Sequence, residues 1–469
     1  GGINAALNTK DENDSPEEHF TDTIKAACGL ADPNAVWGMT QAAPELVHWL
    51  LKLGVKFNMS GYYDVDLRNF GGQKKKRTAF AQSDTGKQIM TAMIDAVRRK
   101  EASGMVERFS HHSFLTLRLC GNICCGCVIR DEYSQETVEL PGDAVIVATG
   151  GMHGLFGNTT GSLSNTGEVT AELFRLGVPL ANGEMIQYHP TTVKCGGKRM
   201  LISEAARGEG GRLFAMKDGK QWYFMEEKYP ELGNLMPRDI TAREIWKVSH
   251  ESEVFLDMTE ISEEIISNKL SGLADDCMTY LHKDIRKEPV SVLPGIHYFM
   301  GGILVDEQHR TPIQNLYAAG ECCAQYHGAN RLGGNSLLGA LYGGRVAAKS
   351  ACEQADVVDL SCATQIDFPP ASQISEIKQL NKVMQETMGV VRNENTLLNG
   401  IQTVQALTGN LPLLGMAVLK SALARKESRG AHWREDYPKS NDDDYLKTTV
   451  ARFDGKQIQI SFVPVPERR

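Results

Sequence analysis

The chain has 469 residues, of which 42% are hydrophobic and 23% charged, and its formal net charge is −8. A chain of this length fits two or three domains, and its acidic balance argues against nucleic acid as a partner, because nucleic-acid binding favours a basic surface. No apolar run approaches the roughly 20 residues that a membrane-spanning helix requires.

Helix signals dominate the N-terminal part of the chain. Ser15–Glu18 places a capping hydroxyl before a proline and two acids, which is typical of a helix start. The stretch Gln41–Leu53 carries apolar residues at helical spacing, and Ala92–Arg99 is predicted to lie in a further helix. Between them, Lys74–Arg77 is a basic run. We interpret it as solvated surface; the alternative is that it borders an anionic ligand site.

The 11 cysteines of a chain this long do not indicate a disulfide framework. The closest group, from Cys120 to Cys127, lacks the two separated ligand pairs of a zinc site. Phe114–Asp131 instead predicts two short strands around a Gly121-Asn122 turn. We therefore interpret these thiols as small side chains buried in a hairpin.

Two apolar runs predict strands of a parallel sheet. Asp143–Thr149 is continuously apolar after its first residue and ends at two glycines, and Asn315–Ala319 is a second run that ends at Gly320. Runs of this kind fit strands buried on both faces. Together they predict an open α/β sheet, with a ligand outside the carboxyl ends of the strands.

The other segments differ in composition. Residues 184–296 are rich in charges and aromatic side chains, and we predict an inserted domain there. Residues 372–426 have helical periodicity throughout. Ser440–Asp444 is predicted to be a solvated acidic turn, and Gln457–Val465 alternates as a strand does.

Six segments carry residues that indicate chemistry. The first, Ala148–Gly151, ends a predicted strand with glycines, which let the backbone approach a phosphate or a ring system. In the second, His189 precedes a proline that stiffens the turn. In the third, Ser203–Gly211, one helical turn would place Glu204 and Arg207 side by side. That pair could be a simple ion pair or a proton relay.

The remaining three segments are Pro237–Ile240, His297–Gly302 and His327–Leu338. They add histidines and arginines beside glycine-rich turns. Such a set suits a small ligand with two carboxylates, because arginine offers a planar fork to a carboxylate and histidine offers a directional donor.

In their order and in their amino-acid sequences, these six segments resemble the flavoprotein subunits of fumarate reductase and succinate dehydrogenase, a family related to L-aspartate oxidase. Four further segments match landmarks of that family: Gly1–Leu7, Arg68–Gly72, Asp84–Gly86 and Arg429–His432. The resemblance covers essentially the whole chain.

The resemblance implies an α/β fold, mixed with α+β features. A Rossmann-like FAD-binding domain would comprise residues 1–183 and 297–371. A mobile capping domain of residues 184–296 would interrupt it and close over the substrate. A helical domain, residues 372–445, and a short C-terminal segment, residues 446–469, would follow.

The resemblance also implies roles for single residues. Arg238 would deliver a proton to the substrate and would be reloaded through Arg207 and Glu204. The residues implied to bind the dicarboxylate are His189, Ser203, His297, Arg331 and Phe70. The residues implied to bind FAD are Gly1, Gly2, Ala148, Thr149, Gly150, Glu168, Glu321, Ser336 and Leu337.

The implied reaction interconverts fumarate and succinate by hydride transfer at FAD, paired with proton transfer by arginine. Arginine is a poor acid in water, with a pKa above about 12, but a developing carbanion is a base strong enough to take its proton. The implied partners are an iron–sulfur subunit and a membrane anchor with quinone. These partners would hold the chain peripherally at the cytoplasmic side of the inner (cell) membrane.

Three positions depart from the family pattern. Ser203 stands where threonine is usual and keeps the hydroxyl. Phe299 replaces a small hydroxyl residue and is expected to narrow or reshape the pocket. Glu168 stands where aspartate is usual. No Gly-x-Gly-x-x-Gly loop, which binds the FAD pyrophosphate, occurs in the chain, and we expect it to precede Gly1 together with the family's flavin-attachment histidine.

Two alternatives stay open. L-aspartate oxidase shares most of the motifs but places an acidic residue in the segment that here reads Arg68–Gly72, where it meets the substrate amine. Phe70 is apolar and cannot bind an amine in this way. Met300 also matches the residue that the reductases have at this position. The second alternative is a non-catalytic assembly subunit without flavin. Only the absent glycine loop favours it, and the intact histidines and arginines argue against it.

Overall fold

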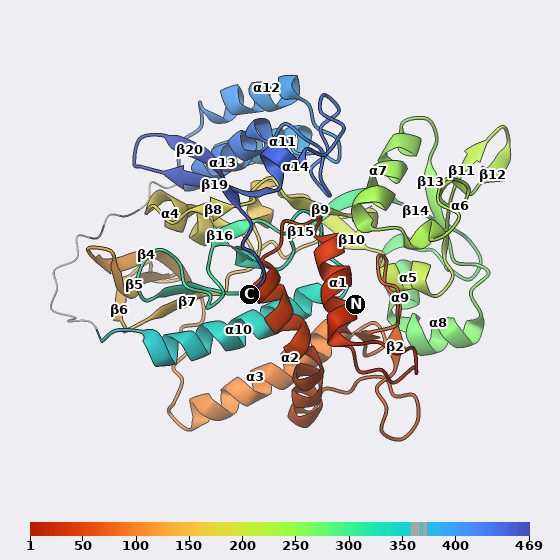
Figure 1. Cartoon of the computed structure of the whole chain (residues 1–469), viewed down its shortest axis with the longest axis horizontal. Helices are drawn as coiled ribbons and strands as arrows, with labels where there is room; N and C mark the ends of the chain where they lie inside the picture. The colour runs from red at the N-terminus through yellow and green to blue at the C-terminus, as the bar shows by residue number, and fades with distance from the viewer. Residues whose placement is uncertain (358–365, 367, 369–372) are drawn as a thin grey trace.

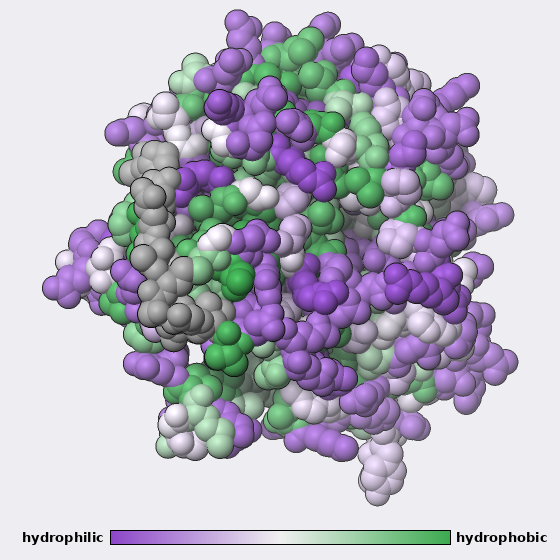
Figure 2. All heavy atoms as spheres, turned by 60° about the vertical axis from the view of Figure 1, so that its left-hand side comes forward, coloured by the Kyte–Doolittle hydropathy of each residue, from purple (hydrophilic) through white to green (hydrophobic). Residues whose placement is uncertain are grey.

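The computed structural model describes residues 1–357, 366, 368 and 373–469. Figure 1 shows helices α1, α2, α3 and α10 in the lower part of the molecule, a group of helices and strands around α7 on the right, and helices α11, α12 and α13 at the top. Figure 2 shows that hydrophilic side chains cover most of one face, with smaller hydrophobic areas between them. No helix of the described residues is both long and apolar enough to span a bilayer.

The predicted N-terminal helices are confirmed. Helix α1 (Pro16–Ala26) is capped by Ser15, whose hydroxyl accepts a backbone N–H of the first turn. Helix α2 (Pro33–Leu53) begins earlier than predicted, because the carboxylate of Asp32 caps it. Helix α3 (Thr85–Ala102) contains the predicted helical stretch.

The prediction of a solvated basic run is wrong for Arg77. Its side chain is fully buried, and its guanidinium lies 2.8 Å from a carboxylate oxygen of Asp14 and 3.1 Å from one of Asp22. The carboxylates of Asp14 and Asp22 offset the cost of burying the arginine, because an unpaired buried charge is strongly unfavourable. Lys75 keeps a partly exposed ion pair with Glu18.

The two predicted parallel strands pair with each other. Strand β17 (Leu316–Ala318) runs parallel to β7 (Val145–Val147) and is fully buried. Helix α10 (Asn335–Gln354) covers the pair through Ala347. The prediction that β7 is buried on both faces is wrong, since Ile146 is 41% exposed. Within the described residues β7 pairs with β17 alone, so its other edge has no strand partner there.

The predicted cysteine hairpin is confirmed. Strands β4 (His112–Cys120) and β5 (Ile123–Asp131) are antiparallel, and β6 (Thr137–Pro141) extends the sheet. Cys124 and Cys125 are buried in it, and Cys127 is half-buried. The prediction of a buried thiol is wrong for Cys120, which is half-buried and disulfide-bonded. Among the described residues, no three His, Cys, Asp or Glu side chains are grouped so that they could hold a metal ion.

Residues 184–296 build two antiparallel sheets, with strand orders β10-β9-β15 and β12-β11-β13-β14. A shared apolar core that includes Phe70 from outside the segment holds the helices of this region to the second sheet. The elements are β9 (Ile186–Cys195), β10 (Lys198–Leu201), α5 (Glu204–Gly208), β11 (Arg212–Lys217), β12 (Lys220–Trp222), α6 (Phe224–Lys228), η2 (Gly233–Leu235), α7 (Arg238–Ser249), β13 (Val254–Asp257), α8 (Glu263–Lys269), α9 (Ser271–Asp276), η3 (Cys277–Leu281), β14 (Val290–Ser291) and β15 (Leu293–Phe299).

Helical periodicity after residue 372 is confirmed by α11 (Ile374–Thr387), α12 (Glu394–Val404) and α13 (Asn410–Ala424). The predicted domain boundary at residues 371–372 lies outside the described residues, and the other boundaries stay predictions.

The predicted acidic turn is wrong in part. Residues Asp442–Tyr445 form the short helix α14, capped by Asn441. Asp442 pairs with Arg429 at 2.5 Å, and this contact ties the acidic segment to the body of the protein.

The last predicted strand is confirmed as β20 (Ile458–Pro464), which pairs with β19 (Lys447–Phe453). Strand β19 in turn pairs with β8 (Leu180–Ala181), so the end of the chain completes a five-stranded sheet of order β18-β16-β8-β19-β20. The remaining elements are β1 (Ile3–Asn4), β2 (Leu67–Arg68), β3 (Thr78–Ala79), η1 (His153–Leu155), α4 (Glu168–Arg175), β16 (Gly302–Leu304), η4 (Gly320–Cys322) and β18 (Cys323–Ala324).

Candidate functional site

Glu204, Arg207 and Arg238 form one buried cluster. Ser203 caps α5, so Glu204 opens that helix and Arg207 lies one turn on, at 3.5 Å between Arg207 Nη2 and Glu204 Oε1. The predicted proximity of these two residues is therefore confirmed. Arg238 opens α7 and donates to Glu204 Oε2 from Nε at 2.9 Å and from Nη2 at 2.5 Å.

The charges of this cluster hold Glu204 ionised. Burial alone would raise the pKa of Glu204, but the charges of Arg238 and Arg207, with hydrogen bonds from Arg238 and the Gly71 amide, outweigh burial and lower the pKa below its usual value. For Arg207 burial lowers the pKa, and it outweighs the charge of Glu204, which raises it. A guanidinium with a lowered pKa gives up its proton more readily than one in water.

His189 and His297 face each other from the paired strands β9 and β15, with ring centroids 5.2 Å apart. Burial, and then the nearby charge of Arg238, lower the pKa of both rings well below 6.5. Nδ1 of His297 lies 2.7 Å from Oγ1 of Thr160. Nε2 of His189 is buried and has no hydrogen-bond partner among the described residues. A buried polar atom without a partner points to a ligand.

Arg331 completes the set of cationic residues. Its guanidinium carbon lies 4.4 Å from the ring centroid of Tyr298, and its Nε is buried without a partner in the described part of the chain. Burial, and then the charge of Arg238, lower the pKa of Arg331 to about 9. Arg331 lies near His297 and has no carboxylate ion-pair partner among the described residues, so it is arranged to receive an anion.

The structure also locates Phe70, the other residue predicted to contact the substrate. The ring is buried, and a methyl group added to Gly333 would lie 3.1 Å from Cβ of Phe70 and 2.9 Å from Oε2 of Glu204. Phe70 therefore lies close to the arginine–carboxylate cluster and presents no polar atom to it.

Sequence reasoning missed Gln187. Its side-chain oxygen accepts from Nη1 of Arg238 at 3.1 Å, and its side-chain nitrogen donates to the carbonyl oxygen of Arg331 at 2.8 Å. Gln187 thus links the two arginines. Its position two residues before His189 on β9 was the available signal, since residues i and i+2 of a strand share a face.

The residues predicted to bind FAD lie around the carboxyl ends of β7 and β17. Ala148 and Thr149 follow β7 and are exposed, and Gly150 has φ +73°. Ser336 and Leu337 lie in the first turn of α10, directly after Gly334 with φ +85°. Exposed backbone after a parallel strand, beside a helix N-terminus, suits a phosphate or a flavin ring.

Three of the predicted FAD-binding positions have other contacts. Glu321 accepts the backbone N–H of Phe299 at 3.0 Å, and the Phe299 ring packs edge-on against His153. Glu168 opens α4 and is exposed. The carbonyl oxygen of Gly1 accepts from Arg68 at 2.7 Å.

Gly2, the last of these positions, is buried beside β3. A methyl group on it would lie 2.8 Å from the carbonyl oxygen of Ala79. Two residues further along the strand, Asn4 donates its backbone N–H to the carbonyl oxygen of Gly334 at 3.1 Å. This bond ties the N-terminal ribbon to the loop before α10.

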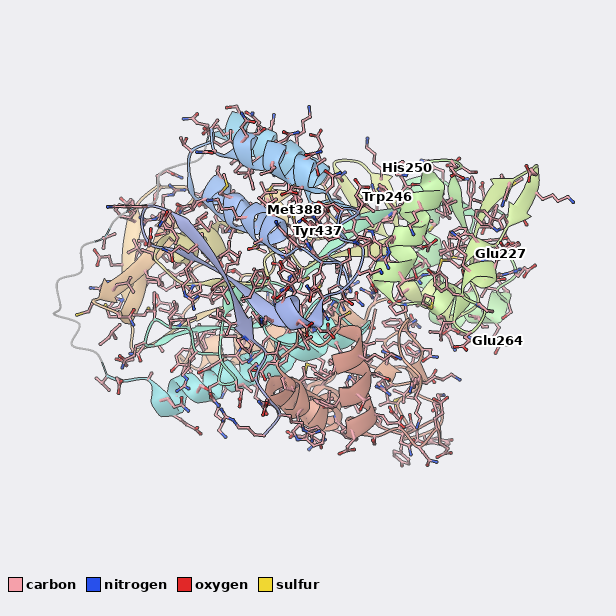
Figure 3. All side chains as sticks on the ribbon, turned by 45° about the horizontal axis from the view of Figure 1, so that its top comes forward. Glu227, Trp246, His250, Glu264, Met388 and Tyr437 are labelled. Atoms are coloured by element: carbon pink, nitrogen blue, oxygen red, sulfur yellow. The ribbon has the colours of Figure 1, made fainter. Side chains whose placement is uncertain are left out.

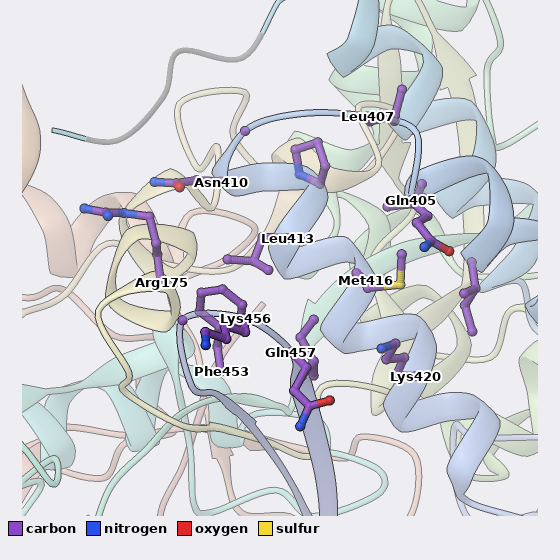
Figure 4. Close-up of a pocket in the computed structure, with 16 residues that line it drawn as sticks. Arg175, Gln405, Leu407, Asn410, Leu413, Met416, Lys420, Phe453, Lys456 and Gln457 are labelled. Atoms are coloured by element: carbon purple, nitrogen blue, oxygen red, sulfur yellow. The ribbon is translucent and has the colours of Figure 1, made fainter. Parts of the chain in front are cut away.

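A cavity of about 630 Å³ lies apart from these residues, between α12, α13 and the β19–β20 hairpin (Figure 4). Leu413, Met416 and Phe453 line it, with Lys420 and Lys456 among the polar residues. It contains none of the residues predicted to bind substrate or FAD.

Comparison with known proteins gives concordant matches. A sequence model of the FAD binding domain matches residues 1–337, and one of the fumarate reductase flavoprotein C-terminus matches residues 407–468. The succinate dehydrogenase flavoprotein subunit of Bacillus subtilis is 37% identical, over 100% of this chain and 91% of its own. An L-aspartate oxidase of a Nostoc species is 32% identical, over 96% of this chain and 86% of its own length. The structure of E. coli quinol fumarate reductase matches with a TM-score of 0.89 and 26% identity, over 99% of this chain and 89% of its own.

Proposed function

The chain belongs to the family of succinate dehydrogenase and fumarate reductase flavoprotein subunits and is an FAD-dependent oxidoreductase, and on that premise we propose that it interconverts fumarate and succinate. The observation that carries the proposal is the buried Arg238–Glu204–Arg207 cluster beside Arg331 and two histidines. This set offers cations for two carboxylates and a chain of proton-carrying groups.

Substrate binding is assigned to Arg331, His189 and His297. The unpaired Nε of Arg331 and Nε2 of His189 supply buried hydrogen-bonding atoms for carboxylate oxygens. Because burial keeps both imidazoles neutral, they contribute hydrogen bonds and no charge. Ser203 is partly buried at the cap of α5, and its hydroxyl is the fourth group assigned to the substrate.

Proton transfer is assigned to Arg238, with Glu204 and Arg207 behind it. The two hydrogen bonds between Arg238 and Glu204 give a proton a direct route between them. Gln187 holds the third guanidinium nitrogen, so the orientation of Arg238 is fixed. Fixed donors in a site that excludes water are worth more than mobile donors in solution.

FAD is assigned to the carboxyl ends of β7 and β17. Ala148, Thr149 and Gly150 on one side and Ser336 and Leu337 on the other would hold it. When bound, it supplies hydride transfer, while the protein orients and polarises the substrate.

The electron partners are a further part of the proposal. We assign the chain to a complex with an iron–sulfur subunit and a quinone-reactive membrane anchor, bound peripherally at the cytoplasmic side of the cell membrane. The match to the C-terminal region of fumarate reductase flavoproteins and the likeness to a quinol fumarate reductase support this assignment.

Parallel steady-state assays with fumarate, succinate and aspartate test the proposed reaction. Turnover of fumarate or succinate, with none of aspartate, is the expected result. The buried apolar Phe70 supports this choice, because it offers no acceptor to a substrate amine. Turnover of aspartate alone would replace the proposal with an oxidase. A purified protein without flavin absorption and without activity would favour the non-catalytic assembly subunit.

A further inference from the structure

A second cavity, of about 300 Å³, lies between α7, the β9–β15 ribbon and the segment that follows α11. Figure 3 places Trp246 and His250 on the side of α7 nearest to Met388. The residues that line the cavity are Asn158, Tyr188, Arg199, Trp246, Ser249, His250, Leu293, Pro294, Gly295, Ile296, Gln385, Gly389 and Val390.

This cavity adjoins the ribbon that carries the two histidines of the substrate site. Tyr188 lines the cavity and precedes His189, and Ile296 lines it and precedes His297. Strands β9 and β15 pair with each other, with an irregularity between Ile296 and Tyr298. The cavity therefore adjoins the same paired strands that carry both histidines.

Arg199 brings a positive charge to this cavity that no carboxylate of the described residues neutralises. Its Nε donates to Oγ1 of Thr192 at 2.5 Å, and its Nη2 lies 3.3 Å from the carbonyl oxygens of Thr192 and Leu293. Arg199 takes part in no ion pair with the described residues. Burial lowers the pKa of Arg199.

The lining has a matching imbalance of charge. It includes the cation Arg199 and the imidazole of His250 but no Asp or Glu, although the chain as a whole carries 58 acidic and 50 basic residues. Apolar surface from Leu293, Ile296 and Val390 forms much of the remaining wall. A partly buried arginine that has no carboxylate partner offers its charge to an anion.

We propose that this cavity is a binding site for a small organic carboxylate, whose charged group pairs with Arg199 and whose apolar body lies against Ile296 and Trp246. Bound there, the ligand contacts the ribbon at Ile296, next to His297, and so restrains the strands that hold His189 and His297. The site is thereby a regulatory one; this last step rests on the proposed function, whereas binding itself does not.

Fluorescence titration with butyrate tests binding without any turnover, because Trp246 lies in the cavity wall, with its ring tilted by 59° against that of His250. We expect a saturable change in emission with butyrate and none with the neutral analogue butyramide. Trp246→Phe should remove the signal. Equal responses to butyrate and butyramide, or an unchanged response in Trp246→Phe, would overturn the proposal.

Charge variants locate the binding group. Arg199→Gln should weaken butyrate binding by about tenfold or more, since a charge-assisted hydrogen bond is lost. Lys198→Gln removes a neighbouring exposed charge and should leave the affinity unchanged. Arg331→Gln removes a cation from the proposed substrate site and should also leave the signal at Trp246. Loss of the signal in Arg331→Gln but not in Arg199→Gln would assign the carboxylate to the substrate site and refute the cavity.

A second variant covers the case in which Arg199→Gln does not fold. Ser249→Asp places a carboxylate in the cavity wall, where it would pair with Arg199 and exclude butyrate. The regulatory step is tested separately: butyrate should change the KM for fumarate of the wild type and not of Ser249→Asp. Absence of fumarate turnover would sink the proposed function while the titration still decides the site.

Discussion

Oε2 of Glu204 accepts two hydrogen bonds from Arg238, a residue 34 positions away in sequence, at 2.9 Å from Nε and 2.5 Å from Nη2. Glu204 is 2% exposed and Arg238 is 6% exposed, so little water screens the pair. The contact joins the first residue of α5 to the first residue of α7 and makes the proposed proton route continuous.

Arg238→Ala should lower the rate of fumarate reduction by about 10²–10⁴-fold, the usual contribution of a positioned proton donor. The FAD residues lie on other elements, so flavin content should stay the same. Arg243→Ala is the matched control, because Arg243 lies on the same helix but stacks on Trp433. Steady-state assays and the flavin spectrum check both; appreciable turnover by Arg238→Ala would remove the donor assignment.

Glu204→Gln should change the acid dependence of stability. Because the folded-state pKa of Glu204 lies below 4.5, the ionised carboxylate stabilises the protein above about pH 4.5, and this stabilisation disappears as pH falls through the folded pKa. Glu204→Gln should therefore lose less stability between neutral and acid pH than the wild type. Thermal midpoints measured across that range check the sign, and parallel curves for the two proteins would contradict it.

His189 and His297 should stay neutral between about pH 6 and 8, since burial and Arg238 lower the pKa of both well below 6.5. Their imidazole ¹H NMR shifts should not titrate in that range. His189→Gln and His297→Gln assign the two signals. A titration midpoint near pH 6.5 for either ring would show that its charge takes part in binding.

Phe70→Glu should weaken fumarate binding by about tenfold or more, because it places a second carboxylate near Glu204 in a buried site. Phe70→Leu keeps the apolar character and should bind nearly as the wild type does. The KM for fumarate in the two variants tests this. Equal KM values would mean that Phe70 does not face the substrate.

Arg77→Met should lower the free energy of unfolding by about 3–5 kcal/mol, because it leaves Asp14 and Asp22 buried without their shared cation. Lys74→Met changes an exposed residue of the same run and should have little effect. Urea unfolding measures both. A loss no larger than that of Lys74→Met would mean that the buried carboxylates find other partners.

Local signals in the sequence predicted the elements and part of the site. Ser15 and the proline after it specify the start of α1, because a capping hydroxyl acts on amides within its own turn. The proximity of Glu204 and Arg207 follows from helical geometry alone. The apolar runs ending in glycine predicted the β7–β17 pair, since parallel strands buried by helices need continuous apolar side chains.

Contacts between distant segments were decided by the tertiary structure. From the sequence, Arg77 is predicted to be a surface cation like the other residues of Lys74–Arg77. In the folded chain α1 packs beside it and brings the carboxylate of Asp22 within 3.1 Å. The apolar run predicts that Ile146 is buried. The structure shows that it is exposed, in a strand that pairs with β17 alone among the described residues. No local pattern encodes the link from Gln187 to both Arg238 and Arg331.

The sequence by itself therefore determined the family, the main helices and strands, and which residue types serve the chemistry, because these depend on neighbours along the chain. The tertiary structure decided which charges meet and which stay unpaired. Glu204 is paired with two arginines, whereas Arg199 has no carboxylate partner among the described residues. Coulomb energies and burial depend on distances in space between segments far apart in sequence, and only the folded chain sets those distances.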